Sequence, residues 1–76
     1  MRNRNIVEIR VAIRKYKNYW WACLFGKPDI EMTGSTEENV KSKIRDHLYE
    51  QQSLGQYPHK AVFEIMYVYR PTRLNH

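Results

Sequence analysis

The chain has 76 residues, of which 42% are hydrophobic and 28% are charged, a composition typical of a folded globular domain. This length allows one domain, close to the lower size limit for folding unaided. Cys23 is the single cysteine, which excludes an intramolecular disulfide and favours a reducing compartment. No apolar run approaches the ~20 residues of a membrane span, and no apolar segment follows the basic start as in a signal peptide. We expect one cytoplasmic domain over 1–76, ordered over about 5–71, with a loose tail at 72–76.

Basic charge is concentrated at the two ends of the sequence. The formal net charge is +5, with thirteen Lys and Arg against eight Asp and Glu. Residues 1–20 hold six basic side chains and one acidic side chain, whereas residues 21–53 are mildly acidic. Such a distribution favours an anionic partner, either a nucleic acid or an acidic protein surface. The alternative is that these charges serve only solubility.

The pattern of the first 25 residues predicts two strands. Residues 6–17 (IVEIRVAIRKYK) alternate, with Val and Ile on one side and Glu, Arg and Ala on the other, which indicates a half-buried strand. Lys17 and Asn18 fit a tight turn, because Asn tolerates positive φ. Residues 19–25 (YWWACLF) are apolar on both faces, which favours a central strand.

A third strand and a helix are predicted next. Gly26-Lys27-Pro28-Asp29 has turn chemistry, and a short strand from Ile30 to Thr33 stops at Gly34. Either hydroxyl of Ser35-Thr36 can cap a helix, and Ser35 with Glu38 fits a capping box. The helix is expected to bury Val40, Ile44 and Leu48 on one stripe and to end at Leu54-Gly55.

The last predicted element is a strand over residues 60–70 (KAVFEIMYVYR), which Pro71 ends because proline cannot extend the ladder. The order is therefore β-β-β-α-β. We predict an α+β domain in which one mainly antiparallel sheet packs a single helix on one face. One helix leaves the other face to meet solvent, a partner or a second copy.

Residues 5–70 resemble the N-terminal domain of HicB-type antitoxins. That family shows two aromatics at the start of its second strand, a Pro-containing turn, a short third strand and a Gly-x-Thr-x-Glu type helix start. The matching residues are Trp20-Trp21-Ala22, Pro28, Ile30 to Thr33, and Gly34-Ser35-Thr36-Glu37-Glu38. The resemblance implies a β-β-β-α-β fold and an antitoxin-like role in which a toxin-type nuclease is neutralised by blocking its site. Family members usually carry a further DNA-binding segment after this domain; we expect none here and therefore do not infer operator-type autoregulation from the resemblance.

Two other small folds have a similar outline. The arm-binding domain of tyrosine recombinases expects a basic third strand, but Asp29 and Glu31 lie there. A double-stranded-RNA-binding fold expects a helix first and basic residues at the start of its last helix, and neither is present. Both stay open as alternatives to the HicB-type domain.

The sequence offers little for catalysis, and we expect no catalytic, cofactor or metal site. None of the three histidines has a partner at metal-ligand spacing. Cys23 shares a face with Trp21, and we expect it to be a buried small hydrophobe. Among the acidic residues, a catalytic pair of Glu64 with either Glu8 or Glu31 is left open.

Aromatic and basic residues suggest a binding surface instead. Trp20 and Trp21 must point to opposite faces of the sheet, so one of them lies away from the helix. Such aromatics beside arginines suit either base stacking with phosphate contacts or a protein interface. The candidate partner-binding residues are Arg10, Arg14, Lys17, Trp20, Trp21, Tyr67, Tyr69 and Arg70. A second small core on that face is the structural alternative.

These observations favour a small non-catalytic binding module that inhibits or regulates a partner protein by occupying its surface. The role is antitoxin-like or that of an inhibitor from a phage or mobile element, and the partner is a protein such as a nuclease or toxin. The alternative is a small basic nucleic-acid-binding protein that uses its first strand. We also expect a homodimer, formed through the uncovered face or an outer strand, and no membrane partner.

Overall fold

The computed structural model describes residues 5–71, and the expected loose tail at 72–76 lies outside them. Four strands and one helix follow in the predicted order: β1 (Ile6–Lys15), β2 (Trp20–Leu24), β3 (Lys27–Gly34), α1 (Glu37–Ser53) and β4 (Val62–Arg70). The strands form one sheet in the order β3-β2-β1-β4. β2 is therefore central, as predicted. The α+β class is confirmed.

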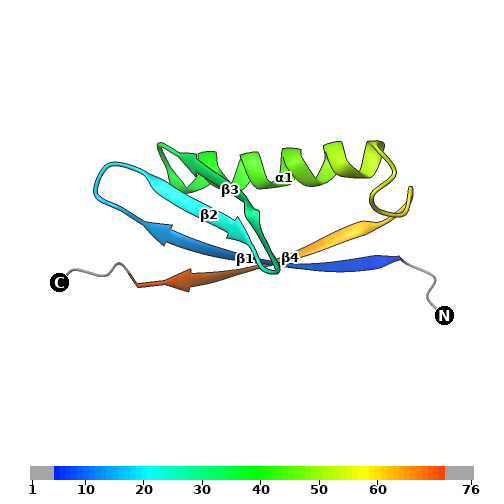
Figure 1. The fold of residues 1–76 in the computed structure, drawn as a ribbon, viewed down its shortest axis with the longest axis horizontal. Coiled ribbons are helices and arrows are strands. Elements are labelled where there is room, and N and C mark those ends of the chain that lie inside the picture. Colours follow the sequence, from blue (N-terminus) through cyan, green and yellow to red (C-terminus); the bar gives the residue numbers. More distant parts are fainter. Residues whose placement is uncertain (1–4, 72–76) are drawn as a thin grey trace.

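Two of the three strand pairings are antiparallel and one is parallel. β1 pairs antiparallel with β2, and β2 pairs antiparallel with β3. α1 then carries the chain across the sheet, so that β4 runs parallel to β1 along nine residues. Figure 1 shows α1 over one side of the sheet, with β1 and β4 side by side beneath it and no element on the opposite side. No helix in the described part of the chain has the length and apolar character needed to cross a membrane.

The core lies between α1 and one face of the central strands. The period-two pattern of β1 is confirmed, because Val11 and Ile13 are fully buried and face the helix. The helix stripe is also as predicted. The buried residues are Ile9, Val11, Ile13, Ala22, Leu24, Val40, Ile44 and Leu48.

β3 is longer than predicted, and its turn is shorter. The chain reverses at Phe25-Gly26, where Gly26 has φ +80°, and β3 already begins at Lys27. Leu24 pairs with Lys27 whereas Cys23 pairs with Glu31, so β3 bulges between these two pairs. The prediction of a turn through Asp29 was wrong because Pro28 is tolerated in a strand at the sheet edge.

The helix begins one residue later than a Ser35 cap requires. Thr36 is the N-cap, and its Oγ1 accepts a hydrogen bond from Asn39 N at 3.0 Å. Asn39 Oδ1 in turn accepts from Ser35 N at 3.2 Å. The predicted Ser35–Glu38 capping box was therefore wrong, because Thr36 is extended and Asn39 occupies the third helical position.

The C-terminal end of α1 is as predicted. Gly55 has φ +87°, and Gln56 N donates to Gln51 O at 2.9 Å while Gly55 N donates to Gln52 O at 3.0 Å. These two bonds form a Schellman motif, which needs the left-handed conformation that glycine adopts without strain.

Ile44→Ala should lower the free energy of unfolding by about 2–4 kcal/mol, because it opens a cavity in a fully buried site. Asp46→Ala, on the exposed side of the same helix, is the matched control and should cost less than about 0.5 kcal/mol. Denaturant melts measure both values. Equal losses would contradict the helix register.

Gly34→Ala should also destabilise the fold. A Cβ at Gly34 would lie 2.7 Å from Val40 N and 2.6 Å from Asn39 Oδ1, and the helix backbone cannot move away without losing its cap. We expect a loss of about 1–3 kcal/mol in denaturant melts. The neighbouring exposed Ser35→Ala should be nearly neutral, and similar losses for both variants would argue against this close approach.

Candidate functional site: the uncovered face of the sheet

The face of the sheet opposite α1 is the candidate site, and we call it the uncovered face. The strand registers place on it the alternate residues of β1 and β4 that point away from the core, together with parts of β2 and β3. Its central members are Glu8, Arg10, Ala12, Arg14, Trp21, Cys23, Glu31, Glu64, Met66, Val68 and Arg70.

Arg14 makes both a hydrogen bond and ring contacts on this face. It lies in register with Trp21 on one side and Arg70 on the other. Its guanidinium carbon is 5.8 Å from the Trp21 ring centroid and 5.9 Å from that of Tyr16. Arg14 Nη1 donates to Tyr16 Oη at 3.0 Å, while the buried Arg14 Nε has no hydrogen-bond partner among residues 5–71. Arg14 is thus held between two aromatic rings.

Trp21 connects Arg14 to the β3 edge. Its Nε1 donates to Glu31 Oε1 at 2.7 Å. Cys23, next to Trp21 on the same face, is half-buried rather than buried as predicted, because none of the described helices and strands covers this side. Partial burial raises the pKa of the Cys23 thiol, and the Glu31 carboxylate raises it further.

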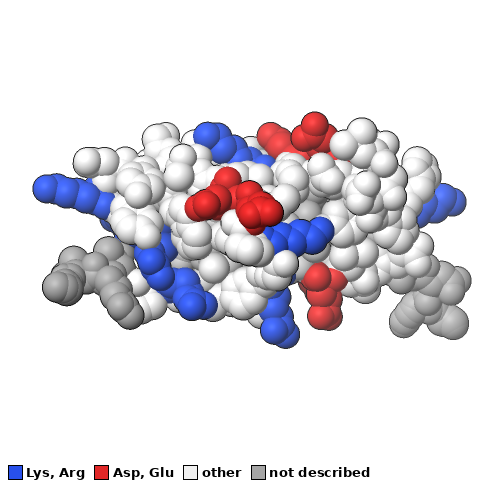
Figure 2. All heavy atoms as spheres, in the orientation of Figure 1, with Lys and Arg blue, Asp and Glu red and all other residues white. Residues whose placement is uncertain are grey.

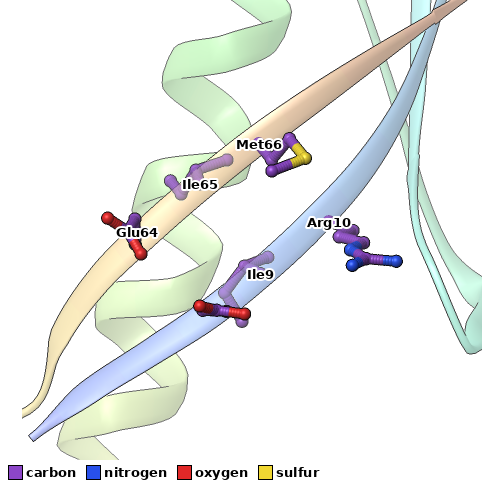
Figure 3. A pocket seen from close by; sticks show the side chains of 6 residues that line it. Ile9, Arg10, Glu64, Ile65 and Met66 are labelled. Carbon is purple, nitrogen blue, oxygen red and sulfur yellow. The ribbon is translucent and has the colours of Figure 1, made fainter.

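The other end of the uncovered face is acidic. The parallel ladder places Glu8 beside Glu64 and Arg10 beside Met66. These four residues, with Ile9 and Ile65, line a shallow hollow of about 250 Å³ between β1 and β4 (Figure 3). The combination of Glu64 with Glu8, left open by the sequence, is therefore the one that the fold brings together.

The charges of the uncovered face balance. Its three arginines are matched by three glutamates, at Glu8, Glu31 and Glu64. The guanidinium groups of Arg10 and Arg70 have no ion-pair or hydrogen-bond partner among residues 5–71, and nor do the carboxylates of Glu8 and Glu64. Basic and acidic side chains are likewise interspersed on the side of the molecule in Figure 2. The uncovered face therefore carries equal numbers of positive and negative side chains, although the whole chain has a net positive charge.

Four of the eight predicted binding residues meet on the uncovered face, namely Arg10, Arg14, Trp21 and Arg70. Lys17 is exposed in the loop between β1 and β2, where Tyr16 and Tyr19 stack at a centroid distance of 4.9 Å. Trp20, Tyr67 and Tyr69 lie on the helix side instead. Tyr67 and Tyr69 do share a face, as predicted, but that face is the one that α1 partly covers.

On the helix side, Tyr69 belongs to a small polar cluster with α1. Its hydroxyl donates to Glu37 Oε2, and Lys41 Nζ lies 3.0 Å from the same carboxylate. The hydrogen bond from Tyr69 and the contact with Lys41 lower the pKa of Glu37, and the same cluster raises the pKa of Lys41. Lys41 Nζ is also 4.5 Å from the Tyr67 ring centroid. The cluster fixes β4 to the first turns of α1.

Burial raises the pKa of the neighbouring Tyr67, although the nearby charges of Arg45 and Lys41 oppose this shift. Tyr67 is thus the more deeply placed of the two tyrosines.

Three contributors to the site escaped the sequence analysis. Tyr16 continues the alternation of Arg14 and could have been placed by that pattern. Glu31 was placed on a strand, but its bond to Trp21 depends on the bulge in β3. Met66 was assigned no role, because β4 is apolar on both faces. Within residues 5–71, no group of three or more His, Cys, Asp or Glu side chains could hold a metal ion.

No protein-family model, curated protein or solved structure matches this chain. The resemblance to HicB-type antitoxins therefore stays a prediction from the residues.

The Cys23 thiol offers a test of the local electrostatics. Because its pKa is raised by burial and by Glu31, alkylation by iodoacetamide near neutral pH should be slower than that of a free cysteine. Glu31→Gln should lower the pKa and speed the reaction. Rates measured against pH give the pKa directly, and an unchanged profile in Glu31→Gln would exclude the electrostatic contribution.

Proposed function

We propose that this protein is a non-catalytic binding module that inhibits or regulates a partner protein by occupying its surface with the uncovered face. The observation that carries the proposal is the arrangement of charge in the β1–β4 ladder. Glu8 lies beside Glu64, and Arg14 beside Arg70. Like charges directly opposite one another destabilise a sheet, so a surface that keeps two such pairs favours an external partner of opposite charge.

The composition of this face supports a protein partner over a nucleic acid. Trp21 has its indole N–H bonded to Glu31 and its ring against Arg14, so it is already engaged rather than open for base stacking. Glu8 and Glu64 would repel phosphates that approached Arg10. An exposed methionine beside an arginine, as at Met66 (57% accessible) and Arg10, and an arginine against a tryptophan, as at Arg14 and Trp21, are typical of protein interfaces.

The resemblance to HicB-type antitoxins suggests the kind of partner. A nuclease or toxin that binds nucleic acid has a basic site, which the Glu8–Glu64 end could oppose, while Arg14 and Arg70 bind acidic groups beside it. A phage or mobile-element inhibitor acts in the same way. We place this activity in the cytoplasm, since the single cysteine suits a reducing compartment.

Reversal of Arg10 and Arg14 tests the proposal. Neither side chain belongs to the core, so Arg10→Glu/Arg14→Glu should keep the fold but abolish capture of a protein partner from the native host. The capture is done with and without nuclease treatment and is followed by reconstitution with the purified partner. Arg45→Glu/Lys60→Glu makes the same change of charge at exposed positions outside this face and should retain binding.

The salt dependence separates the two classes of partner. A protein partner should survive nuclease treatment and protect Cys23 from alkylation. If capture instead depends on nucleic acid, the nucleic-acid alternative replaces the proposal. In that case a plot of log affinity against log salt concentration should fall with a slope of about 0.9 for each phosphate neutralised. Binding that survives the double reversal would move the functional surface elsewhere.

A further inference from the structure

The two outer edges of the sheet are built differently. The β3 edge has several features that block pairing with another strand: the bulge opposite Cys23-Leu24, Pro28, and the charged Lys27 and Asp29. In addition, Lys43 Nζ from α1 donates to Thr33 O at 2.8 Å. β3 is thus protected against addition of a further strand.

Among the described residues, the β4 edge carries Glu64 and Arg70 but lacks the bulge, the proline and the lysine bond that protect the β3 edge. β4 is regular over nine residues, contains no proline and pairs only with β1 among the described strands. Val62 N donates to Asn5 O at 2.8 Å on the β1 side, so the backbone groups of Phe63, Ile65, Tyr67 and Tyr69 point outward. A long, regular and open edge of this kind is a template for another strand.

We propose that a second copy of this chain occupies the β4 edge, with the two β4 strands paired antiparallel. The four strands of each copy then form one continuous sheet. A two-fold axis normal to the sheet relates the copies, which puts both α1 helices on one side and both uncovered faces on the other. The proposal goes beyond the binding function, because it uses the β4 edge and leaves Glu8, Arg10, Arg14 and Trp21 of the uncovered face accessible to a partner.

The charges of β4 select one register. Glu64 and Arg70 are its only charged residues, and both point to the uncovered face. If Tyr67 of one copy lies opposite Tyr67 of the other, Glu64 of each copy lies directly opposite Arg70 of the other. Both ion pairs fall at positions without mutual backbone bonds, where opposing side chains come closest. A register with Met66 opposite Met66 would instead place Glu64 of each copy opposite Val68 of the other.

The remaining pairs of this register are apolar. Met66 lies opposite Val68 of the second copy, and Ile65 lies opposite Tyr69 of the second copy. Met66 and Tyr69 are 57% and 54% exposed in the single chain, so the pairing covers apolar surface that α1 leaves open. Tyr67 lies opposite Tyr67 of the second copy at the two-fold axis, where the outward backbone N–H and C=O groups of both residues can form hydrogen bonds with each other.

A charge swap tests the proposal. Glu64→Arg alone, or Arg70→Glu alone, turns both ion pairs into like-charge pairs and should raise the dissociation constant of the dimer about tenfold or more. The double variant Glu64→Arg/Arg70→Glu restores the pairs and should recover the dimer. Analytical ultracentrifugation at tens of micromolar measures all four proteins. Glu50→Arg makes the same change of charge at an exposed position of α1; it is the matched control and should leave dimerisation unchanged.

Cysteine cross-linking tests the register, in a Cys23→Ser background. Met66→Cys and Val68→Cys chains, mixed, should cross-link, because opposing Cα atoms lie about 4.5 Å apart. Either variant alone places its cysteines about 8 Å apart, too far for a disulfide. Cross-linking of Met66→Cys or Val68→Cys alone would overturn the register. A wild-type monomer at hundreds of micromolar, or a dimer insensitive to both single charge changes, would overturn the β4 interface without affecting the proposed function.

Discussion

The structure depends on one helix having one apolar stripe. Val40, Ile44 and Leu48 are spaced by four, so they present a single narrow surface to the sheet. That surface covers the central strands on one face and leaves the other face without a second layer. β1 satisfies both environments because its residues alternate, with aliphatic side chains toward α1 and charged side chains away from it. The polar character of the candidate site is therefore a consequence of how the core is made.

The direction of β4 determines which charges become neighbours. Because α1 returns the chain across the sheet, β4 runs parallel to β1, and residues meet in the same order along both strands. Acidic residues consequently meet at the start of the ladder and arginines at its end. An antiparallel β4 in the same place would bring glutamates toward arginines and neutralise both pairs internally. The parallel pairing therefore keeps like charges side by side on the uncovered face.

The local elements could be predicted from the sequence, but the pairing between them could not. Alternation in residues 6–13 and the spacing of Val40, Ile44 and Leu48 each depend on neighbours along the chain, which the sequence shows directly. β4 is apolar on both sides, so its pattern does not indicate that Tyr67 and Tyr69 face the helix while Met66 faces away. The bond between Trp21 and Glu31 depends on a bulge whose position no local pattern specifies.

The same helix also explains why β4 is the open edge. α1 starts directly after β3 and packs closest to β3 and β2, where Lys43 reaches the outer strand. At the opposite edge, the helix side of β4 is covered by aromatic side chains instead. Phe63 contacts Tyr57 and Tyr49 with ring centroids 5.0 and 5.9 Å apart. Such contacts cover one face of a strand but satisfy none of its outward backbone groups. A helix displaced toward β3 therefore leaves two surfaces available: the uncovered face, which presents side chains, and the β4 edge, which presents backbone groups. The two surfaces share Glu64 and Arg70, which lie on the outer strand of that face.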